Sequence, residues 1–239
     1  MMTRRVLLAA GLGLTTGSRP TRSPVARTQG AAGNDWFWTT VEHIEARVPD
    51  GGPSNGVIEH SRYGIEAPRA GRVNPNGGPP ALADFYVKAR FAPDTTSDRS
   101  WDVGFVWRVD EDLDALWWTI DQDRRWALSR GIWAITPRDG EEITDGRLCD
   151  DDPVETPVHV QALVAGSRLA CSVNGSAVVN TELPERQAPG HVGIVANLAA
   201  GNAAPDGATA YRGLTLWAIE RDDISPLPEM ESRSASTTC

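Results

Sequence analysis

Carboxylate side chains crowd together at two neighbouring points of the chain. One cluster is Asp110-Glu111-Asp112-Leu113-Asp114, and the other is Asp121-Gln122-Asp123. Carboxylates this close together can bind Ca²⁺ or act as the acid and base of glycoside hydrolysis. Both clusters adjoin predicted turns, where runs of charge are usually solvated. We therefore interpret them as turn residues and predict no catalytic residue, no metal site and no cofactor. A glycoside hydrolase that uses these acids is the alternative.

Tryptophan is the second residue type with a chemistry to offer, because its ring can stack on the apolar face of a sugar. Alternation along 101–109 places Trp107 on a face that we expect to be core, and Arg108 on the opposite face. In the next run, Trp117 and Asp121 share a face, which makes Trp117 the candidate for an exposed platform. Burial is the commoner fate of a single tryptophan and is the competing interpretation. The predicted ligand-binding residues are Arg108, Trp117, Asp121, Trp126 and Arg130, with Trp133 as a further candidate.

The sequence contains no recognisable pairing of a nucleophile with a base. Gly52-Pro53-Ser54-Asn55-Gly56 matches Gly-x-Ser-x-Gly, but turn residues flank it where a nucleophile elbow needs a strand and a helix. The histidines lie far apart in the sequence, and His159 and His191 fall at predicted strand starts, where a surface or satisfied interior imidazole is the ordinary explanation. These residues therefore predict no catalytic triad.

The three cysteines lack the close spacing of a zinc site. Cys171 alternates with Leu169 and Val173, so we expect it to be a small core residue. Whether Cys149 and Cys171 form a disulfide is a question that the sequence leaves open, because spacing alone does not give the geometry.

From Asp35 onward, apolar residues recur at every second position in short runs that Gly, Pro, Asn and Asp clusters separate. This pattern predicts an all-β protein, an antiparallel β-sandwich or barrel, with no helix. Asn174-Gly175 between two alternating runs predicts a hairpin with a type I′ turn. The predicted strands are 36–42, 57–60, 84–91, 101–109, 116–121, 125–130, 132–136, 158–164, 168–173, 177–182, 191–197 and 211–220.

The order of these runs resembles a known superfamily. The run 84–91 resembles the opening strand of a concanavalin A-like lectin/glucanase domain of the laminin-G-like and 3-keto-disaccharide-hydrolase-like type. Val103-Gly104-Phe105-Val106-Trp107-Arg108 and the pair Trp117-Trp118 are similar to its next strands, and Gly190-His191-Val192-Gly193-Ile194 to a later one. The resemblance covers about 35–220 and implies a jelly roll of two curved sheets. Its relatives often bind carbohydrate, and the fold hosts enzymes and non-enzymes alike.

The first residues have the layout of a bacterial export signal. Thr3-Arg4-Arg5 precedes a short apolar run that is too short to be an ordinary transmembrane helix, and the paired arginines resemble a twin-arginine signal. We expect 1–33 to be signal and linker, 34–222 to be the jelly roll, and 223–239 to be a disordered tail. The chain is therefore predicted to be exported, with no transmembrane segment beyond the signal.

Charge narrows the partners. The first 30 residues hold five arginines and no acid, so the remainder carries 18 basic and 32 acidic residues. Such a surface repels phosphate backbones, so we expect no nucleic-acid partner. The favoured function is a non-catalytic exported domain that binds carbohydrate or a cell-surface polymer. The alternatives are the hydrolase already named and a structural or protein-interaction module without a small ligand, and the sequence leaves the oligomeric state open.

Overall fold

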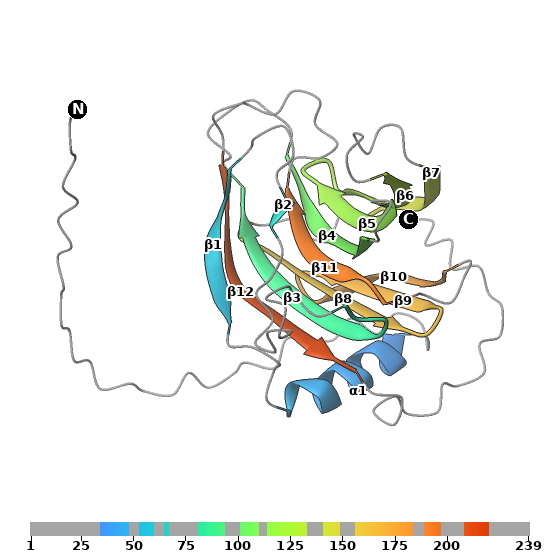
Figure 1. Ribbon diagram of the computed structural model, residues 1–239. Coiled ribbons are helices and arrows are strands. Elements are labelled where there is room, and N and C mark those ends of the chain that lie inside the picture. The colour runs from blue at the N-terminus through green and yellow to red at the C-terminus, as the bar shows by residue number, and fades with distance from the viewer. Residues whose placement is uncertain are drawn as a thin grey trace, which may run out of the picture.

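Two antiparallel sheets of six strands each form the molecule, as seen in a computed structural model (Figure 1). The structure describes residues 34–47, 53–59, 65–66, 81–93, 101–109, 114–132, 141–148, 156–183, 189–196 and 208–219. The predicted signal segment 1–33 and the predicted tail 223–239 lie outside these residues. In sheet A the strand order is β1 (Ser54–Glu59), β12 (Ala208–Ala218), β3 (Phe85–Ala92), β8 (Val158–Ala165), β9 (Arg168–Val173) and β10 (Ser176–Glu182).

Sheet B contains the remaining strands. Their order is β2 (Ile65–Glu66), β11 (His191–Ala196), β4 (Asp102–Val109), β5 (Asp114–Asp121), β6 (Arg125–Ile132) and β7 (Glu141–Arg147). Neighbours in both sheets are often far apart in sequence, as β12 beside β3 and β11 beside β4 show. This crossing of connections between two stacked sheets is the jelly-roll sandwich that the sequence predicted.

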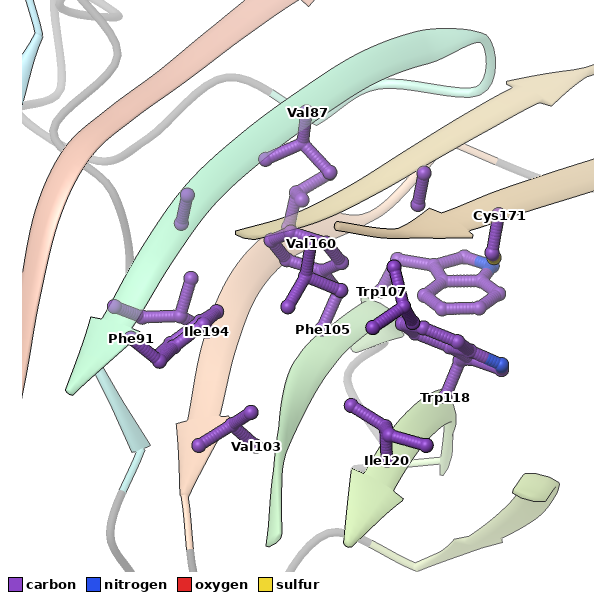
Figure 2. Close-up of a cluster of buried hydrophobic side chains, with 14 of the residues drawn as sticks. Val87, Phe91, Val103, Phe105, Trp107, Trp118, Ile120, Val160, Cys171 and Ile194 are labelled. Carbon is purple, nitrogen blue, oxygen red and sulfur yellow. The ribbon is translucent and has the colours of Figure 1, made fainter. Parts of the chain in front are cut away.

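The core lies between the two sheets, where side chains at every second position of each strand point inward (Figure 2). Trp107 and Trp118 are both fully buried there, from neighbouring strands of sheet B. Cys171 faces them from sheet A and is an unpaired thiol, as expected for a core residue. The period-two alternation therefore identified the inward faces of β4 and β5 correctly.

The predicted hairpin is confirmed. Ser176 pairs directly with Val173, which leaves Asn174 and Gly175 as a two-residue loop. Both loop residues have positive φ, 49° and 89°, as a type I′ turn requires. The Asn174 side chain also accepts a hydrogen bond from the backbone N–H of His159 at 2.7 Å, so the turn is fastened to the next strand of the sheet.

One predicted strand is wrong. The segment 36–42 belongs to helix α1 (Asn34–Glu45). Its apolar residues Trp36, Phe37, Val41 and Ile44 are buried against the outer face of sheet A, the face turned away from sheet B (Figure 1). They recur at helical spacing, but the sequence also alternates over a few residues, and the tertiary contact decides between the two patterns.

Two strands lacked a sequence signal. β2 has only two residues, and β7 consists of polar and acidic residues at an edge of sheet B, where no alternation of burial is needed. The predicted strand 132–136 is not seen as such, since β6 continues through Ile132 and 133–136 lie outside the described residues. Within the described part of the chain, no helix has both the length and the apolar character needed to cross a bilayer.

Candidate functional site

The outer face of sheet B, the face turned away from the core, carries Trp117 at its centre. The strand register places Val106 directly beside Trp117 on one side and Ser129 on the other. On the far side of Ser129 the next partner is Glu142 of β7. This row therefore runs from an apolar side chain, across an aromatic ring, to a hydroxyl and then a carboxylate.

Trp117 occupies the predicted face but is not an exposed platform. It is only 4% exposed, and it packs with Val106, Ala115 and Val195, which are also buried. The prediction failed because alternation fixes the direction of a side chain and not whether anything lies over it. Trp117 can therefore support neighbouring groups from below, while an open stacking surface is absent.

Two of the predicted binding residues are on the wrong face. Trp126 pairs with Ile120 and Arg130 pairs with Leu116, so both side chains leave β6 on its inward side. Trp126 packs at the border of the core. The turn between β5 and β6 sets the register of the two strands, and the sequence alone does not give that register. The observed register places Ser129 and Ala127 on the outer face. Trp133, the further candidate, lies outside the described residues.

Asp121 does share the outer face with Trp117, and it has a structural task there. Its Oδ1 accepts the backbone N–H of Arg125 at 2.8 Å across the turn between β5 and β6. Burial raises the pKa of its carboxyl, and the backbone hydrogen bonds from Arg125 and Asp123 oppose that rise. Across the sheet it is paired with Asp102, which is buried. This hydrogen bond agrees with the interpretation of Asp121 as a residue of the turn.

Arg108 lies at the end of β4, where its backbone has a φ of 61°. A Cβ on Gly190 would lie 2.5 Å from the Arg108 Cα, so the two backbones approach each other more closely than a side chain allows. Arg108 lies six positions along β4 from Asp102, the cross-strand partner of Asp121, and nothing in the described contacts joins Arg108 to Trp117. The five predicted residues are thus not brought together.

The sequence missed the polar half of the same face. Thr119, Ala127 and Ser129 are half-buried, and the β7 residues Glu142 and Asp145 are exposed. Asp145 stands opposite Ala127, and Thr119 stands opposite Ala127 on the other side. Glu142 and Asp145 come next to the hydroxyl side chains only because β7 pairs with β6. These acids were not predicted from the sequence, because β7 was not predicted as a strand.

The outer face of sheet A is organised differently, because α1 covers one end of it. Where the helix ends, Glu45 Oε1 accepts hydrogen bonds from the Tyr86 hydroxyl and from Lys88 Nζ, both at 2.7 Å. Gln161 donates to the Tyr86 hydroxyl at 2.5 Å, and Ser172 donates to Gln161 Oε1 at 2.6 Å. This hydrogen-bonded chain crosses three strands and satisfies the buried polar groups beside the helix.

Beyond this chain, basic side chains continue along the same face. Arg90 is paired in register with Arg212 on β12 and with His159 on β8. Burial, together with the charges of Arg90 and Lys88, lowers the pKa of His159 from 6.5 to about 4. His159 is therefore a neutral imidazole at pH 7, next to two exposed guanidinium groups.

The acid cluster at 110–113 lies outside the described residues. Among the residues that are described, no three His, Cys, Asp or Glu side chains gather in a way that could hold a metal ion. His159 and His191 stand on different sheets. The described part of the chain thus gives no acid/base pair or triad to which a reaction can be assigned.

No protein-family model and no curated protein sequence matches this chain. Solved structures do. A β-fructofuranosidase of Aspergillus kawachii, complexed with glycerol, superposes with a TM-score of 0.52 at 14% identity, over 77% of this chain and 29% of that one. A fructosyltransferase from A. japonicus gives 0.51 at 11% identity, over 80% and 29%. The carbohydrate-binding module CBM66 from Bacillus subtilis gives 0.43 at 12% identity, over 56% and 75%.

The chain has a concanavalin A-like jelly-roll fold, as its strand order predicted. It spans under a third of the length of the A. kawachii and A. japonicus enzymes. At these identities the likeness concerns the fold alone, and a fold of this kind carries many functions.

Proposed function

We propose that this protein is a non-catalytic carbohydrate-binding domain whose ligand lies on the outer face of β5, β6 and β7. The observation that carries the proposal is the row Trp117, Ser129, Glu142, in which an aromatic ring, a hydroxyl and a carboxylate are direct cross-strand neighbours. Ser129 and Glu142 can form hydrogen bonds with the hydroxyl groups of a sugar, while the buried Trp117 ring supports the strand beneath them and does not itself stack on the ligand.

The accessible groups of this face are polar. Thr119 and Ser129 are half-buried, and Glu142 and Asp145 are exposed, so donors and acceptors are available beside a ring that packing holds rigid. Rigid support under a few polar groups is what a specific site needs. The β-fructofuranosidase and the fructosyltransferase that superpose on this chain have the names of enzymes that act on carbohydrate, so a sugar is the first ligand to test.

A glycan array on the purified chain tests the proposal, with Ser129→Arg as the decisive variant. A long side chain at 129 would fill the space over the row, and we expect it to weaken glycan binding at least about tenfold. Val57→Arg is the matched control, because Val57 is 54% exposed on the edge strand of the other sheet. Equal binding by both variants, or no glycan bound by the unaltered chain, would overturn the proposal.

The non-catalytic part is tested separately. The glycans that bind are incubated with the protein and the reducing ends are counted over time. We expect no release, because the proposal gives the acids of this face the role of hydrogen-bonding to the ligand and not that of an acid/base pair. Turnover that disappears when one acid of 110–123 is replaced would favour the hydrolase instead.

We also propose that residues 1–33 direct export, on the strength of Arg4-Arg5 and the apolar run after them. N-terminal sequencing of the product from the culture medium tests this. A mature chain that begins downstream of the apolar run is the expected result. An intact Met1 on protein recovered from the cytoplasm would refute it.

A further inference from the structure

We propose that Arg90 and Arg212, with His159 beside them, form a second binding site on the outer face of sheet A that takes the carboxylate of an acidic saccharide. The site is separate from the one on sheet B. We infer the preference for a carboxylate from the arginine pair, while the inference that the ligand is a saccharide rests on the proposed function.

The strand register builds the site. Arg212 pairs with Arg90, and Arg90 pairs with His159, so the three side chains form one row across β12, β3 and β8. Neighbouring strands lie about 4.8 Å apart, so the row extends over roughly 10 Å. All three share the face that α1 covers further along, since Tyr86 and Lys88 of the same strand contact Glu45 of the helix.

A bulge holds Arg212 in this row. The register of β12 shifts between Arg212 and Thr215, and Gly213 has a φ of 62° there. The N–H of Gly213 donates to Asn55 Oδ1 of the edge strand at 2.8 Å. The bulge therefore begins directly after Arg212, and the hydrogen bond to Asn55 holds the backbone next to Arg212 in place.

The two guanidinium groups lack a counter-ion within the part of the chain that the structure describes. Glu45, at the end of α1, is a carboxylate on this face, and it is already bound by Tyr86 and Lys88. Like charges placed directly opposite on a sheet repel each other. The positive charge of this pair attracts an anion from outside, even though the chain as a whole has a net charge of −9.

The chemistry of the row fits a carboxylate that has a hydroxyl next to it. Arginine forks bind planar carboxylates with two parallel hydrogen bonds. The neutral imidazole of His159 offers one donor and one acceptor, which is what a sugar hydroxyl uses. Long, densely charged polymers such as nucleic acids are disfavoured, because the acidic remainder of the surface repels them.

Calorimetric titration with trigalacturonate, and with the same trimer as its neutral methyl ester, tests the site. We expect the acid to bind at least about tenfold more tightly than the ester, and Arg90→Gln and Arg212→Gln each to remove most of that difference. Arg47→Gln is the matched control, since Arg47 is an exposed arginine just after the end of α1 and belongs to neither of the two proposed rows. It is expected to bind like the unaltered chain.

Several results would overturn the inference: equal affinity for acid and ester, unchanged binding by both arginine variants, or equally tight binding of inorganic phosphate or a DNA oligonucleotide. Ser129→Arg, titrated in parallel, separates the two sites. If it alone loses the acidic trimer, the ligand lies on sheet B, so this inference fails while the proposed function stands. If the array finds no neutral glycan but the trimer still depends on Arg90 and Arg212, the proposed function fails and this site stands.

Discussion

The hydroxyl of Tyr86 donates a hydrogen bond to Glu45 Oε1 at 2.7 Å, and this bond joins the end of helix α1 to the sheet beneath it. The same hydroxyl accepts from Gln161, so the helix is connected to two strands through one oxygen. Burial raises the pKa of Tyr86 well above its ordinary value, and the nearby Glu45 carboxylate raises it further. The phenol therefore stays protonated and remains a donor.

Replacing Tyr86 with Phe should lower the free energy of unfolding by about 1–3 kcal/mol, because the buried Gln161 amide loses its acceptor. Glu45→Gln keeps an acceptor for Tyr86 and removes only the partly exposed ion pair with Lys88, so it should cost less than about 1 kcal/mol. Urea unfolding of the two variants gives both values. A Tyr86→Phe protein as stable as the parent would show that the bond contributes nothing.

His159 should make the protein less stable as the pH falls from 6.5 towards 4. The pKa of this imidazole is about 4 in the folded chain and 6.5 ordinarily, so in this window the unfolded chain binds the proton and the folded chain does not. The loss should be on the order of 1–3 kcal/mol. Unfolding curves of the parent and of His159→Gln at several pH values should diverge here, with the variant less sensitive. Parallel curves would contradict the prediction.

Gly104 should not tolerate alanine. A Cβ there would overlap the backbone carbonyl oxygen of Trp118 on the adjacent strand, which cannot move aside as a flexible side chain can. We expect Gly104→Ala to cost about 3 kcal/mol or more. Gly166→Ala is the comparison, since Gly166 has open space around it and only its φ of 63° opposes a side chain, which costs about 1 kcal/mol. Thermal melts of the two variants should separate crowding from backbone strain.

Trp36 and Arg168 should be energetically coupled. The Arg168 guanidinium lies 4.1 Å from the centre of the Trp36 ring, and its Nε donates to Asn180 at 3.1 Å. Burial lowers the pKa of this arginine and the charge of Glu182 opposes that effect, while the face of the Trp36 ring attracts the guanidinium through a cation–π contact. A double-mutant cycle of Trp36→Leu and Arg168→Met should give a coupling of about 0.5–2 kcal/mol. Additive effects would mean that the ring serves α1 only as an apolar anchor.

Much of the sandwich could be predicted from local pattern. The alternation that puts Trp107 and Trp118 in the core, and the positive φ that Asn174-Gly175 needs, are properties of a few adjacent residues. The helix at 36–42 could not be separated from a strand in this way, because both patterns fit a short segment. Its contact with Tyr86 and Trp217 on sheet A settles the choice.

The same distinction between local pattern and tertiary contact applies to the candidate sites. The sequence by itself determined that Trp117 points away from the core and that a two-residue turn joins β9 to β10, since side-chain direction and turn type depend on neighbours in the chain. Only the tertiary structure decided that Trp117 is buried, that Ser129 rather than Trp126 stands beside it, and that Arg90 meets Arg212. Those facts depend on strand register and on covering layers, which bring together residues that are not close in sequence, such as Arg90 and Arg212, and which no short stretch of sequence reveals.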